Sequence, residues 1–388
     1  MMSPRPAEPT PLTEAHGRVL AADVAALRTQ PPADVSAMDG YAVRSADVAR
    51  VPVKLKLVGE VAAGHPFQGT VGAGEAARIF TGGVLPPGTD TIVIQENTVR
   101  EGDAVIVTIV SSKGKHVRVE GLDFKRGAVL LAKSHRLTDR DLALAAAMNH
   151  PTVPVHRRPK VAVLATGDEL VMPGTTPGFG EIVYSNGYAT MALARREGCE
   201  VVDLGIVPDR LAETAAGVRR AREVGADILV TSGGASVGDY DLVQEALAAE
   251  GLALSFWKVA LRPGRPMMHG RLGATHVLGL PGNPVSAYVC AVLFLVPLIR
   301  RLAGRSDVAP APEPARLGCD LPANDERADY LRATLAPGPD GVPIATPARA
   351  QDSSMLMLLA RADCLLVREP HAPPVKAGER CSVIRLGP

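Results

Sequence analysis

The sequence predicts a multidomain protein of the α/β plus β class, in which a central α/β domain with a mostly parallel sheet accompanies separate β-rich and helical units. Three observations favour this class. The chain has 388 residues, which is more than one hydrophobic core usually serves. Short β-rich runs near the N-terminus give way to regular strand and helix alternation in the middle. A β-rich pattern then returns after a proline-rich stretch near the C-terminus.

The N-terminal part is predicted to hold two helical stretches with a β-rich module between them. Apolar residues recur at helical spacing over residues 10–27, where Thr13 can cap the helix, and again in LTDRDLALAAAMN at residues 137–149. Short β-rich runs separated by Gly and Pro turns occupy residues 53–131. Neither helical stretch has a comparable partner nearby in the sequence. We therefore expect the two to pack together, with the β-rich module inserted between them.

Strand and helix alternation over residues 158–304 predicts the central α/β domain. The expected strands are KVAVLAT, EVVDLGIV, DILVTS, ALSFWKVAL and ATHVLGL, and a long apolar helix begins at PVSAYV. Alternation at this spacing predicts a mainly parallel sheet with helices on both faces. The segment DVAPAPEPA is typical of a linker, and the β-rich C-terminal part follows it.

Composition and charge exclude several classes of function. A formal net charge of +1 and 3% aromatic residues disfavour nucleic-acid binding. The amino terminus is proline-rich and polar where a signal peptide needs an apolar segment, and the longest apolar stretch, residues 288–299, is about half of the ~20 residues needed to span a bilayer. The five cysteines lack metal-ligand spacing, so we expect them to be buried. These features predict a cytoplasmic protein without nucleic-acid or membrane partners.

Three glycine-containing turns, each directly after an apolar strand, form the candidate ligand site. Ligands of open α/β sheets bind beyond the carboxyl ends of the strands, where such turns meet helix N-termini. The turns are ATGDEL at residues 165–170, TSGGASVGDYD at residues 231–241 and LPGNPVSA at residues 280–287.

The second turn is suited to a phosphate. Gly233 and Gly234 let backbone N–H groups approach a bulky anion, while Ser232 and Ser236 add hydroxyl donors. A double-Gly turn by itself also serves as a tight connection between elements. Because the other two turns are expected at the same edge of the sheet, we interpret the second turn as part of a ligand site rather than as a simple tight connection.

The third turn is expected to start a helix. Asn283 occupies the N-cap position and Pro284 the first helical position, which leaves helix N–H groups free to face a ligand. A well-capped helix start without a ligand explains this turn equally well when it is taken alone.

Charged residues gather at the same turns. Asp168 and Glu169 lie in the first turn, and Asp239 and Asp241 in the second. Carboxylates beside a phosphate site commonly hold Mg²⁺, although a single Asp near a helix start is more often a cap. The segment FWKVALRPGRP adds three cations that could form an anion funnel or a solvated basic edge. These cations are Lys258, Arg262 and Arg265.

The sequence resembles the MoeA-type molybdopterin molybdenumtransferase family, which includes the gephyrin E-domain. The resemblance depends on the three turns together with SAMDGYAV at residues 36–43, TGGVLPPGTDTIVIQE at residues 81–96, the Ser185–Asn186 pair and FWKVALRPGRP, all in the family order. It covers nearly the whole chain. The C-terminal segment is the most divergent part.

The resemblance implies four domains. A helical domain I spans residues 7–35 and 132–157, and an inserted β-rich domain II spans residues 36–131. Domain III, residues 158–305, is implied to have the three-layer α/β fold of MogA-type proteins, and domain IV, residues 312–388, is implied to be a β-barrel. The family forms a homodimer whose active site lies between domain III of one subunit and domains I and II of the other. Asp39 and Thr81 are therefore expected to act in trans.

The resemblance also implies the reaction. Adenylated molybdopterin and molybdate react in the presence of Mg²⁺ to give molybdenum cofactor and AMP, and a MogA-type adenylyltransferase is the implied partner. By motif, Asp241 and Glu169 are expected to hold the metal, Lys258 to bind molybdate or a phosphate, and Asp39 to complete the catalytic set. The implied substrate-binding residues are Thr81, Arg118, Asp123, Ser232, Gly233, Gly234, Ser236, Arg262, Pro281, Gly282, Asn283, Arg332 and Ser353.

One departure from the family pattern leaves alternatives open. Arg262 stands where the family motif has a second Lys, and a guanidinium keeps the charge but does not readily carry a proton. If that position must transfer a proton, the chain is a weakened paralogue. A non-catalytic molybdopterin-binding scaffold and a molybdopterin adenylyltransferase are the two rival functions.

Overall fold

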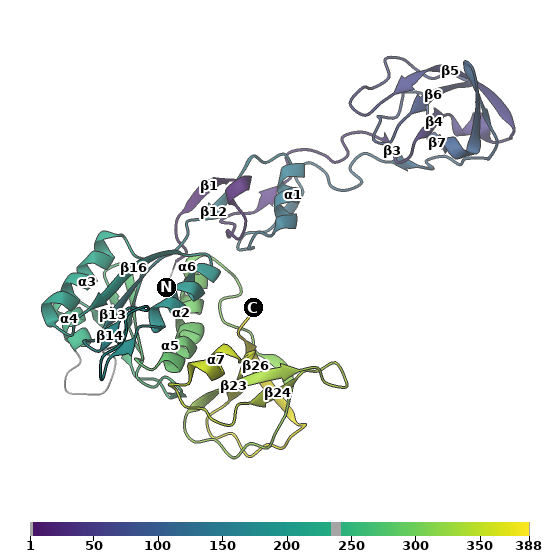
Figure 1. Ribbon diagram of the computed structural model, residues 1–388. Coiled ribbons are helices and arrows are strands. Elements are labelled where there is room, and N and C mark those ends of the chain that lie inside the picture. Colours follow the sequence, from purple (N-terminus) through teal and green to yellow (C-terminus); the bar gives the residue numbers. More distant parts are fainter. Residues whose placement is uncertain (1–2, 234–241, 388) are drawn as a thin grey trace.

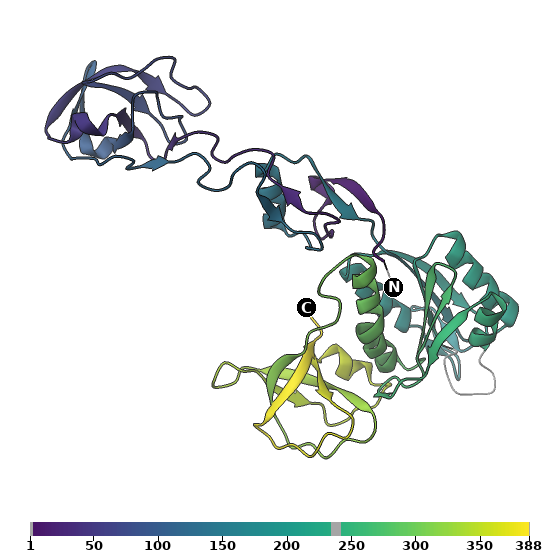
Figure 2. The ribbon, with the colours of Figure 1, turned by 180° about the vertical axis from the view of Figure 1, so that it is seen from behind.

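The protein has four modules. The computed structural model describes residues 3–233 and 242–387. Figures 1 and 2 show an N-terminal module in the middle of the molecule and a β-rich module at one end, joined to it by two extended segments. A central α/β module and a C-terminal barrel lie together at the other end. The molecule is therefore elongated.

The N-terminal module contains one α-helix and two short antiparallel strand pairs. Strand β1 pairs with β12 and strand β2 pairs with β11, and apolar side chains such as Leu20 and Met148 form its core. The helix begins with a capping box between Thr138 and Asp141. Its elements are β1 (Ala7–Pro11), η1 (Leu12–Glu14), β2 (Val24–Ala25), β11 (Val129–Leu131), α1 (Asp139–Ala147) and β12 (Thr152–His156).

The expected helix over residues 10–27 is wrong. This segment holds the end of β1, the single 3₁₀ turn η1 and strand β2, and residues 7–11 extend along β12. Backbone N–H groups further along donate to other segments, such as Leu20 to the carbonyl oxygen of His135 at 3.0 Å. Backbone pairing with segments that are distant in the sequence thus replaces the helix that the apolar spacing favoured.

The β-rich module confirms the short strands predicted over residues 53–131. Its six-stranded sheet has the order β7-β4-β6-β5-β9-β8, and a separate strand pair, β3 with β10, also belongs to the module. Its elements are β3 (Val35–Ser36), β4 (Gly40–Val43), η2 (Ser45–Val48), β5 (Val53–Val61), β6 (Glu75–Ile79), β7 (Thr91–Ile94), η3 (Gln95–Asn97), β8 (Thr98–Glu101), β9 (Ala104–Val107) and β10 (Val117–Arg118).

The central module is a three-layer α/β fold with a mostly parallel sheet. Its strand order is β16-β13-β17-β21-β20-β18, with the first four strands parallel and the last two antiparallel to their neighbours. The sequence reading missed β20. The sheet strands are β13 (Lys160–Thr166), β16 (Glu200–Val207), β17 (Ile228–Ser232), β18 (Ala253–Trp257), β20 (Met268–Leu272) and β21 (Thr275–Leu280), and β14 (Leu170–Val171) pairs with β15 (Ile182–Val183) beside it.

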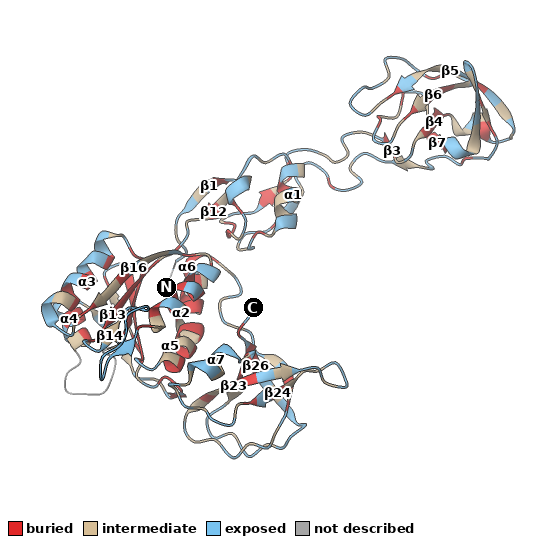
Figure 3. Ribbon diagram, viewed as in Figure 1, coloured by how far each residue is buried: buried red, intermediate tan, exposed pale blue. Residues whose placement is uncertain are grey.

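Helices cover both faces of this sheet, and their inward faces are buried (Figure 3). One core cluster joins the sheet to α3 and α4, and the other joins it to α2 and the long C-terminal helical segment. The helices are α2 (Asn186–Arg196), α3 (Leu211–Glu223), α4 (Leu242–Ala249), α5 (Pro284–Cys290), the π-helical turn η4 (Ala291–Leu295) and α6 (Val296–Leu302).

The segment Pro284–Leu302 is one continuous helix of 19 residues, which confirms the long apolar helix predicted to begin at PVSAYV. By length and composition it could cross a membrane, but 67% of it is buried inside the protein. Buried core helices of soluble proteins can have the same length and composition. The burial assigns this helix to the core of the central module.

The C-terminal module is a closed barrel. Its strands follow the order β23-β24-β22-β26-β25, and pairing between β23 and β25 closes the sheet. Strand β19 (Leu261–Arg262) of the central module adds to β23 in parallel. The elements are β22 (Glu313–Leu317), β23 (Ala328–Ala336), β24 (Ile344–Pro347), α7 (Leu356–Ala360), β25 (Cys364–Arg368) and β26 (Arg380–Arg385).

Candidate functional site

A cavity of about 590 Å³, here called the turn cavity, lies where the glycine-containing turns meet. Its walls come from all three turns, from the start of α2 and from the barrel module. Six residues proposed from the sequence line it. They are Glu169, Ser232, Gly233, Pro281, Gly282 and Asn283. The barrel contributes Ser354 and Leu356, which sequence reasoning did not identify.

Close backbone contacts hold the turns together. Gly233 has a φ of +96°, and a Cβ atom there would lie 2.4 Å from the carbonyl oxygen of Thr166, so only glycine fits. The Asn186 side chain donates to the carbonyl oxygen of Gly282 at 2.7 Å. The second turn is thus packed against the first turn, and the third turn is hydrogen-bonded to the start of α2. Gly234, Ser236, Asp239 and Asp241 lie outside the described residues.

Asn283 differs from its expected role. It occupies the N-cap position of α5 and Pro284 follows at the first helical position, but its side chain forms no cap hydrogen bond. Instead, its Nδ2 atom donates to Ser353 Oγ at 2.9 Å, and the backbone N–H of Val285 donates to the Ser353 carbonyl oxygen at 3.0 Å. Asn283 therefore connects the turn cavity to the barrel.

Three carboxylates lie near one another at one side of the turn cavity. The backbone N–H of Asp209 donates to Asp168 Oδ1 at 3.2 Å, and Glu169 lines the cavity itself. Partial burial, followed by the negative charges of Glu169 and Asp168, raises the pKa of the Asp209 carboxyl. A cation at this position would offset that repulsion.

The residues present fit Mg²⁺. Across residues 3–233 and 242–387, no group of three or more His, Cys, Asp and Glu side chains is arranged to hold a metal ion. Mg²⁺ does not require such a cage, because it is usually held by one or two carboxylates together with substrate phosphates and water. Glu169 supplies an exposed carboxylate of this kind.

Two buried hydroxyl groups in the lining of the turn cavity have no hydrogen-bond partner within the described part of the chain. They belong to Thr166 and Tyr184, each about 2% exposed. Burial raises the pKa of Tyr184 to about 12, so its hydroxyl stays protonated at neutral pH and can donate. Thr166 lies within the ATGDEL motif, which could have identified it. No pattern in the sequence distinguished Tyr184.

A second cavity of about 600 Å³, here called the barrel cavity, is rich in arginine. Arg332 is 1% exposed and donates from Nη2 to the Asp352 carbonyl oxygen at 3.1 Å, while its Nε atom has no partner among the residues that the structure describes. A buried guanidinium with an unused donor is suited to an oxyanion. The other charged residues in the lining are Arg262, Arg349, Arg368, Asp325 and Asp329.

Arg262 forms ion pairs with the barrel. Its Nε donates to Asp329 Oδ1 at 2.8 Å and its Nη2 to Asp329 Oδ2 at 3.1 Å, while Nη2 also lies 3.2 Å from Asp325 Oδ2. The planar fork that distinguishes Arg from Lys is thus used in a bidentate contact.

The other two cations of the expected funnel do not line either cavity. The Lys258 ammonium lies 4.5 Å from the centre of the Trp257 ring, and Arg265 is exposed. Among these three cations, the structure therefore brings only Arg262 to a cavity wall.

The residues proposed in the β-rich module lie far from both cavities. Asp39 Oδ1 accepts hydrogen bonds from the backbone N–H of Thr81 at 2.8 Å and from its hydroxyl at 2.7 Å. These bonds, the backbone one first, lower the pKa of Asp39. Arg118 pairs with Val35 between strands β10 and β3, and Asp123 lies in the exposed turn that follows. In Figure 1 this module is at the opposite end of the molecule from the central sheet.

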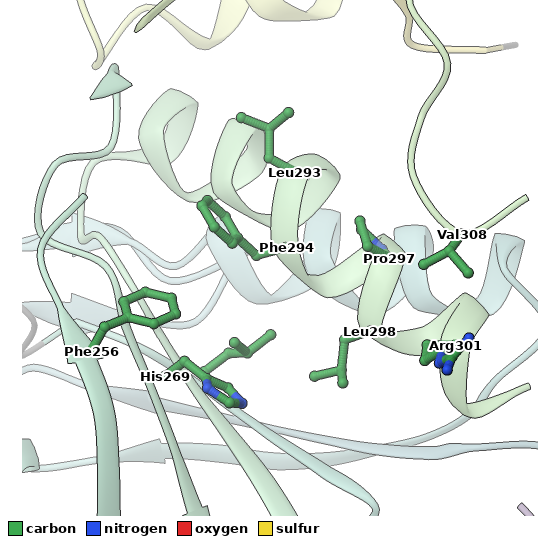
Figure 4. Close-up of a pocket in the computed structure, with 9 residues that line it drawn as sticks. Phe256, His269, Leu293, Phe294, Pro297, Leu298, Arg301 and Val308 are labelled. Atoms are coloured by element: carbon green, nitrogen blue, oxygen red, sulfur yellow. The ribbon is translucent and has the colours of Figure 1, made fainter. Parts of the chain in front are cut away.

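A third cavity, of about 300 Å³, has a different character. It lies between strands β18, β20 and β21 and the long helix, and Figure 4 shows its largely apolar lining. His269 and Arg301 are its polar residues, and Phe256 and Phe294 form much of the wall. This composition is unsuited to a highly charged ligand.

Comparisons with known proteins match three regions of the chain, the first of which covers both the N-terminal and the β-rich module. The family model for the MoeA N-terminal region, domains I and II, matches residues 1–149. The model for a probable molybdopterin-binding domain matches residues 162–301, and that for the MoeA C-terminal region, domain IV, matches residues 314–386.

Individual relatives extend over most of the chain. A molybdopterin molybdenumtransferase of Haemophilus influenzae is 34% identical over 96% of this chain and 92% of its own. One from a Nostoc strain is 42% identical over 76% of this chain and 69% of its own. The crystal structure of a molybdopterin biosynthesis MoeA protein from Pyrococcus horikoshii is 30% identical, covers 100% of this chain and 96% of its own, and has a TM-score of 0.86. The fold, the matched regions and these relatives show that the chain is an enzyme of the MoeA family of molybdopterin molybdenumtransferases.

Proposed function

We propose that the protein transfers molybdenum from molybdate into adenylated molybdopterin, with Mg²⁺-dependent release of AMP. The observation that carries this proposal is the placement of two cavities of nearly equal volume on either side of residues 351–354. Gln351 lines the barrel cavity and Ser354 the turn cavity, while Asp352 and Ser353 contact Arg332 and Asn283. A pterin phosphate ligand and an oxyanion can thus be held by neighbouring parts of one segment.

The turn cavity is the proposed site of the adenylated pterin. The Gly233 backbone and the Ser232 side chain are proposed to contact a phosphoryl group, and Gly282 and Asn283 also line this cavity. Glu169, together with Asp241 in the same family motif set, is proposed to hold Mg²⁺, which when bound would neutralise charge on the phosphoanhydride. The mainly neutral donors of the cavity orient the phosphoanhydride for cleavage.

The barrel cavity is the proposed site of molybdate. Molybdate is a tetrahedral dianion, and Arg332 offers a buried N–H donor that has no partner among the described residues, where a charged hydrogen bond is strong because water is excluded. Ser353 lies between the two cavities, so its hydroxyl can contact the oxyanion as it moves toward the pterin. Lys258 and Arg262 are proposed to attract the anion from the surrounding surface.

The working assembly is proposed to be a homodimer in the cytoplasm. The β-rich module, which contains Asp39, Thr81 and Arg118, lies at the end of the molecule remote from the central sheet. Asp123 follows it in the chain and donates its N–H to the Gln30 carbonyl oxygen at 3.0 Å, beside the N-terminal module. These four residues are therefore proposed to complete the turn cavity from a second subunit. The domain division at residues 7–35 with 132–157, 36–131, 158–305 and 312–388 belongs to the same proposal. A MogA-type adenylyltransferase would supply the adenylated substrate.

One assay tests this function. The purified protein is incubated with adenylated molybdopterin, molybdate and Mg²⁺, and AMP and pterin-bound molybdenum are measured. We expect both products, and we expect both to fall in Asp241→Ala. Tight pterin binding without AMP release would support a scaffold instead, and pyrophosphate release from ATP and molybdopterin would support an adenylyltransferase.

A further inference from the structure

The start of helix α2 has unused hydrogen-bonding capacity that the proposed roles leave unexplained. An α-helix cannot satisfy its first N–H groups internally, and the Ser185 side chain at the N-cap position makes no capping bond. No acidic residue occupies the first turn. Ser185 and Asn186 nevertheless line the turn cavity. The positive end of the helix dipole therefore faces the cavity without an acidic residue in its own first turn to balance it.

Tyr184 supplies a second and independent observation. Its side chain is 2% exposed, and its hydroxyl has no hydrogen-bond partner among residues 3–233 and 242–387. An ideal Cβ atom built on Gly187 would lie 1.6 Å from this hydroxyl oxygen, so the hydroxyl is seated directly against the first turn of α2. Glycine at position 187 is thus required for space. The absent side chain makes room for a buried donor at the helix start.

Leaving such a hydroxyl unpartnered is costly. A buried polar group without a hydrogen bond destabilises the folded protein, and a phenylalanine would fill the same volume without that penalty. The hydroxyl does not hold the folded chain together, because within the described residues it donates to nothing. A ligand that accepts its hydrogen bond would explain its presence.

We propose that the first turn of α2, with the Tyr184 and Ser185 hydroxyls, is a second oxyanion subsite of the turn cavity, and that it takes one of two adjacent phosphoryl groups. The inference rests on the proposed function, because adenylated molybdopterin contains a phosphoanhydride. The turn at Gly233 holds one phosphoryl group and the start of α2 holds the other. Helix N–H groups and neutral hydroxyls bind such an anion without an additional cation.

ADP and AMP are suitable probes because they share adenosine and differ by one phosphoryl group. Their dissociation constants are measured by calorimetry in the presence of Mg²⁺. We expect the parent protein to bind ADP about tenfold or more tightly than AMP, since a charge-assisted hydrogen bond is worth at least that factor. Tyr184→Phe should weaken ADP binding by about tenfold and leave AMP binding within about twofold of the parent.

Tyr188→Phe is the matched control. Tyr188 lies on α2, and its ring centre is 5.8 Å from that of Tyr184, but its side chain is 47% exposed. Its loss of a hydroxyl should leave both affinities unchanged. Thermal unfolding supplies a second readout, because Tyr184→Phe should keep or raise the Tm when the hydroxyl has no partner in the free protein. Gly187→Ala should reproduce the loss of ADP affinity by displacing the hydroxyl.

The opposite results overturn the subsite. These are no ADP preference in the parent protein, unchanged ADP affinity in Tyr184→Phe, or an equal loss for AMP and ADP, which would place the hydroxyl at the shared phosphate. The proposed function fails separately. If the parent protein prefers ADP but releases no AMP from adenylated molybdopterin, the subsite is supported and the proposed reaction is wrong. If it releases AMP but does not prefer ADP, the reaction is supported and the subsite is wrong.

Discussion

The turn cavity and the barrel cavity have nearly the same volume, about 590 and 600 Å³, but opposite chemistry. Glu169 is the charged residue in the lining of the turn cavity, where the other polar groups are hydroxyls, amides and backbone. The barrel cavity has four arginines and two aspartates. The first suits a large ligand whose own negative charge is shared with a metal ion, and the second suits a small free oxyanion. The difference suggests that the enzyme keeps its two anionic substrates apart until they react.

The largest expected effect comes from the buried arginine of the barrel cavity. Arg332→Met keeps a similar volume but removes the guanidinium, so the KM for molybdate should rise about 100-fold, which is the upper range for a charged hydrogen bond. Binding of adenylated molybdopterin should change little, because this ligand belongs to the other cavity. Steady-state kinetics with varied molybdate and calorimetry with the pterin measure the two effects.

Arg349→Met is the control for Arg332→Met. Arg349 lines the same cavity but is exposed, so its contribution is screened by water. If the two variants weaken molybdate binding equally, the burial of Arg332 does not matter and the assigned difference between the cavities is wrong.

The sequence predicted the turn cavity better than the barrel cavity, for a physical reason. Turns after parallel strands meet at one edge of a sheet, so Glu169, Gly233 and Gly282 could be placed together from strand order alone. The contact of Arg262 with Asp329 depends on how β19 adds to the barrel, which no local pattern records. The same limit explains the lost helix over residues 10–27, where backbone pairing with distant residues, such as Leu20 with Val155 and β2 with β11, decides the structure.

A smaller effect is expected at the carboxylate of the turn cavity. Glu169→Gln keeps the size and an acceptor oxygen but removes the charge, so the Mg²⁺ concentration for half-maximal AMP release should rise about tenfold. Molybdate KM should stay the same. A Mg²⁺ titration of initial rates measures this, and Glu181→Gln, an exposed carboxylate in the same module whose Oε2 accepts the N–H of Gly178, is the control. An unchanged Mg²⁺ requirement would remove Glu169 from the metal site.

Arg262→Lys introduces the residue of the family motif at a position where the Arg262 side chain forms ion pairs with Asp325 and Asp329. The Arg262 side chain is 45% exposed, so loss of its bidentate contact with Asp329 should lower the stability of the folded protein by at most about 1 kcal/mol. Activity should remain within about threefold, because the charge that attracts molybdate is kept. Denaturant unfolding and turnover rates are measured together. A gain in turnover of more than about tenfold would instead show that this position transfers a proton and that the chain is a weakened paralogue.

The smallest expected effect distinguishes the cavities by pH. Burial and the charges of Glu169 and Asp168 raise the pKa of Asp209 beside the turn cavity, whereas hydrogen bonds from Arg327 lower the pKa of Asp325 in the barrel cavity to about 2. The ionised Asp209 is therefore less favourable in the folded state than in the unfolded one. This penalty is present above the folded pKa and disappears as the pH falls below the unfolded value of about 3.8.

Asp209→Asn tests that sign. The variant should raise the Tm slightly at pH 7, by about 1–2 °C, because Asp209 is exposed and the repulsion is partly screened. The gain should vanish near pH 3 and should also shrink when Mg²⁺ and ADP are added at pH 7, since a cation beside Glu169 offsets the same repulsion. Thermal scans at the two pH values, with and without these ligands, measure the change. A Tm gain that Mg²⁺ and ADP leave untouched would place the cation elsewhere and remove the electrostatic contrast between the two cavities.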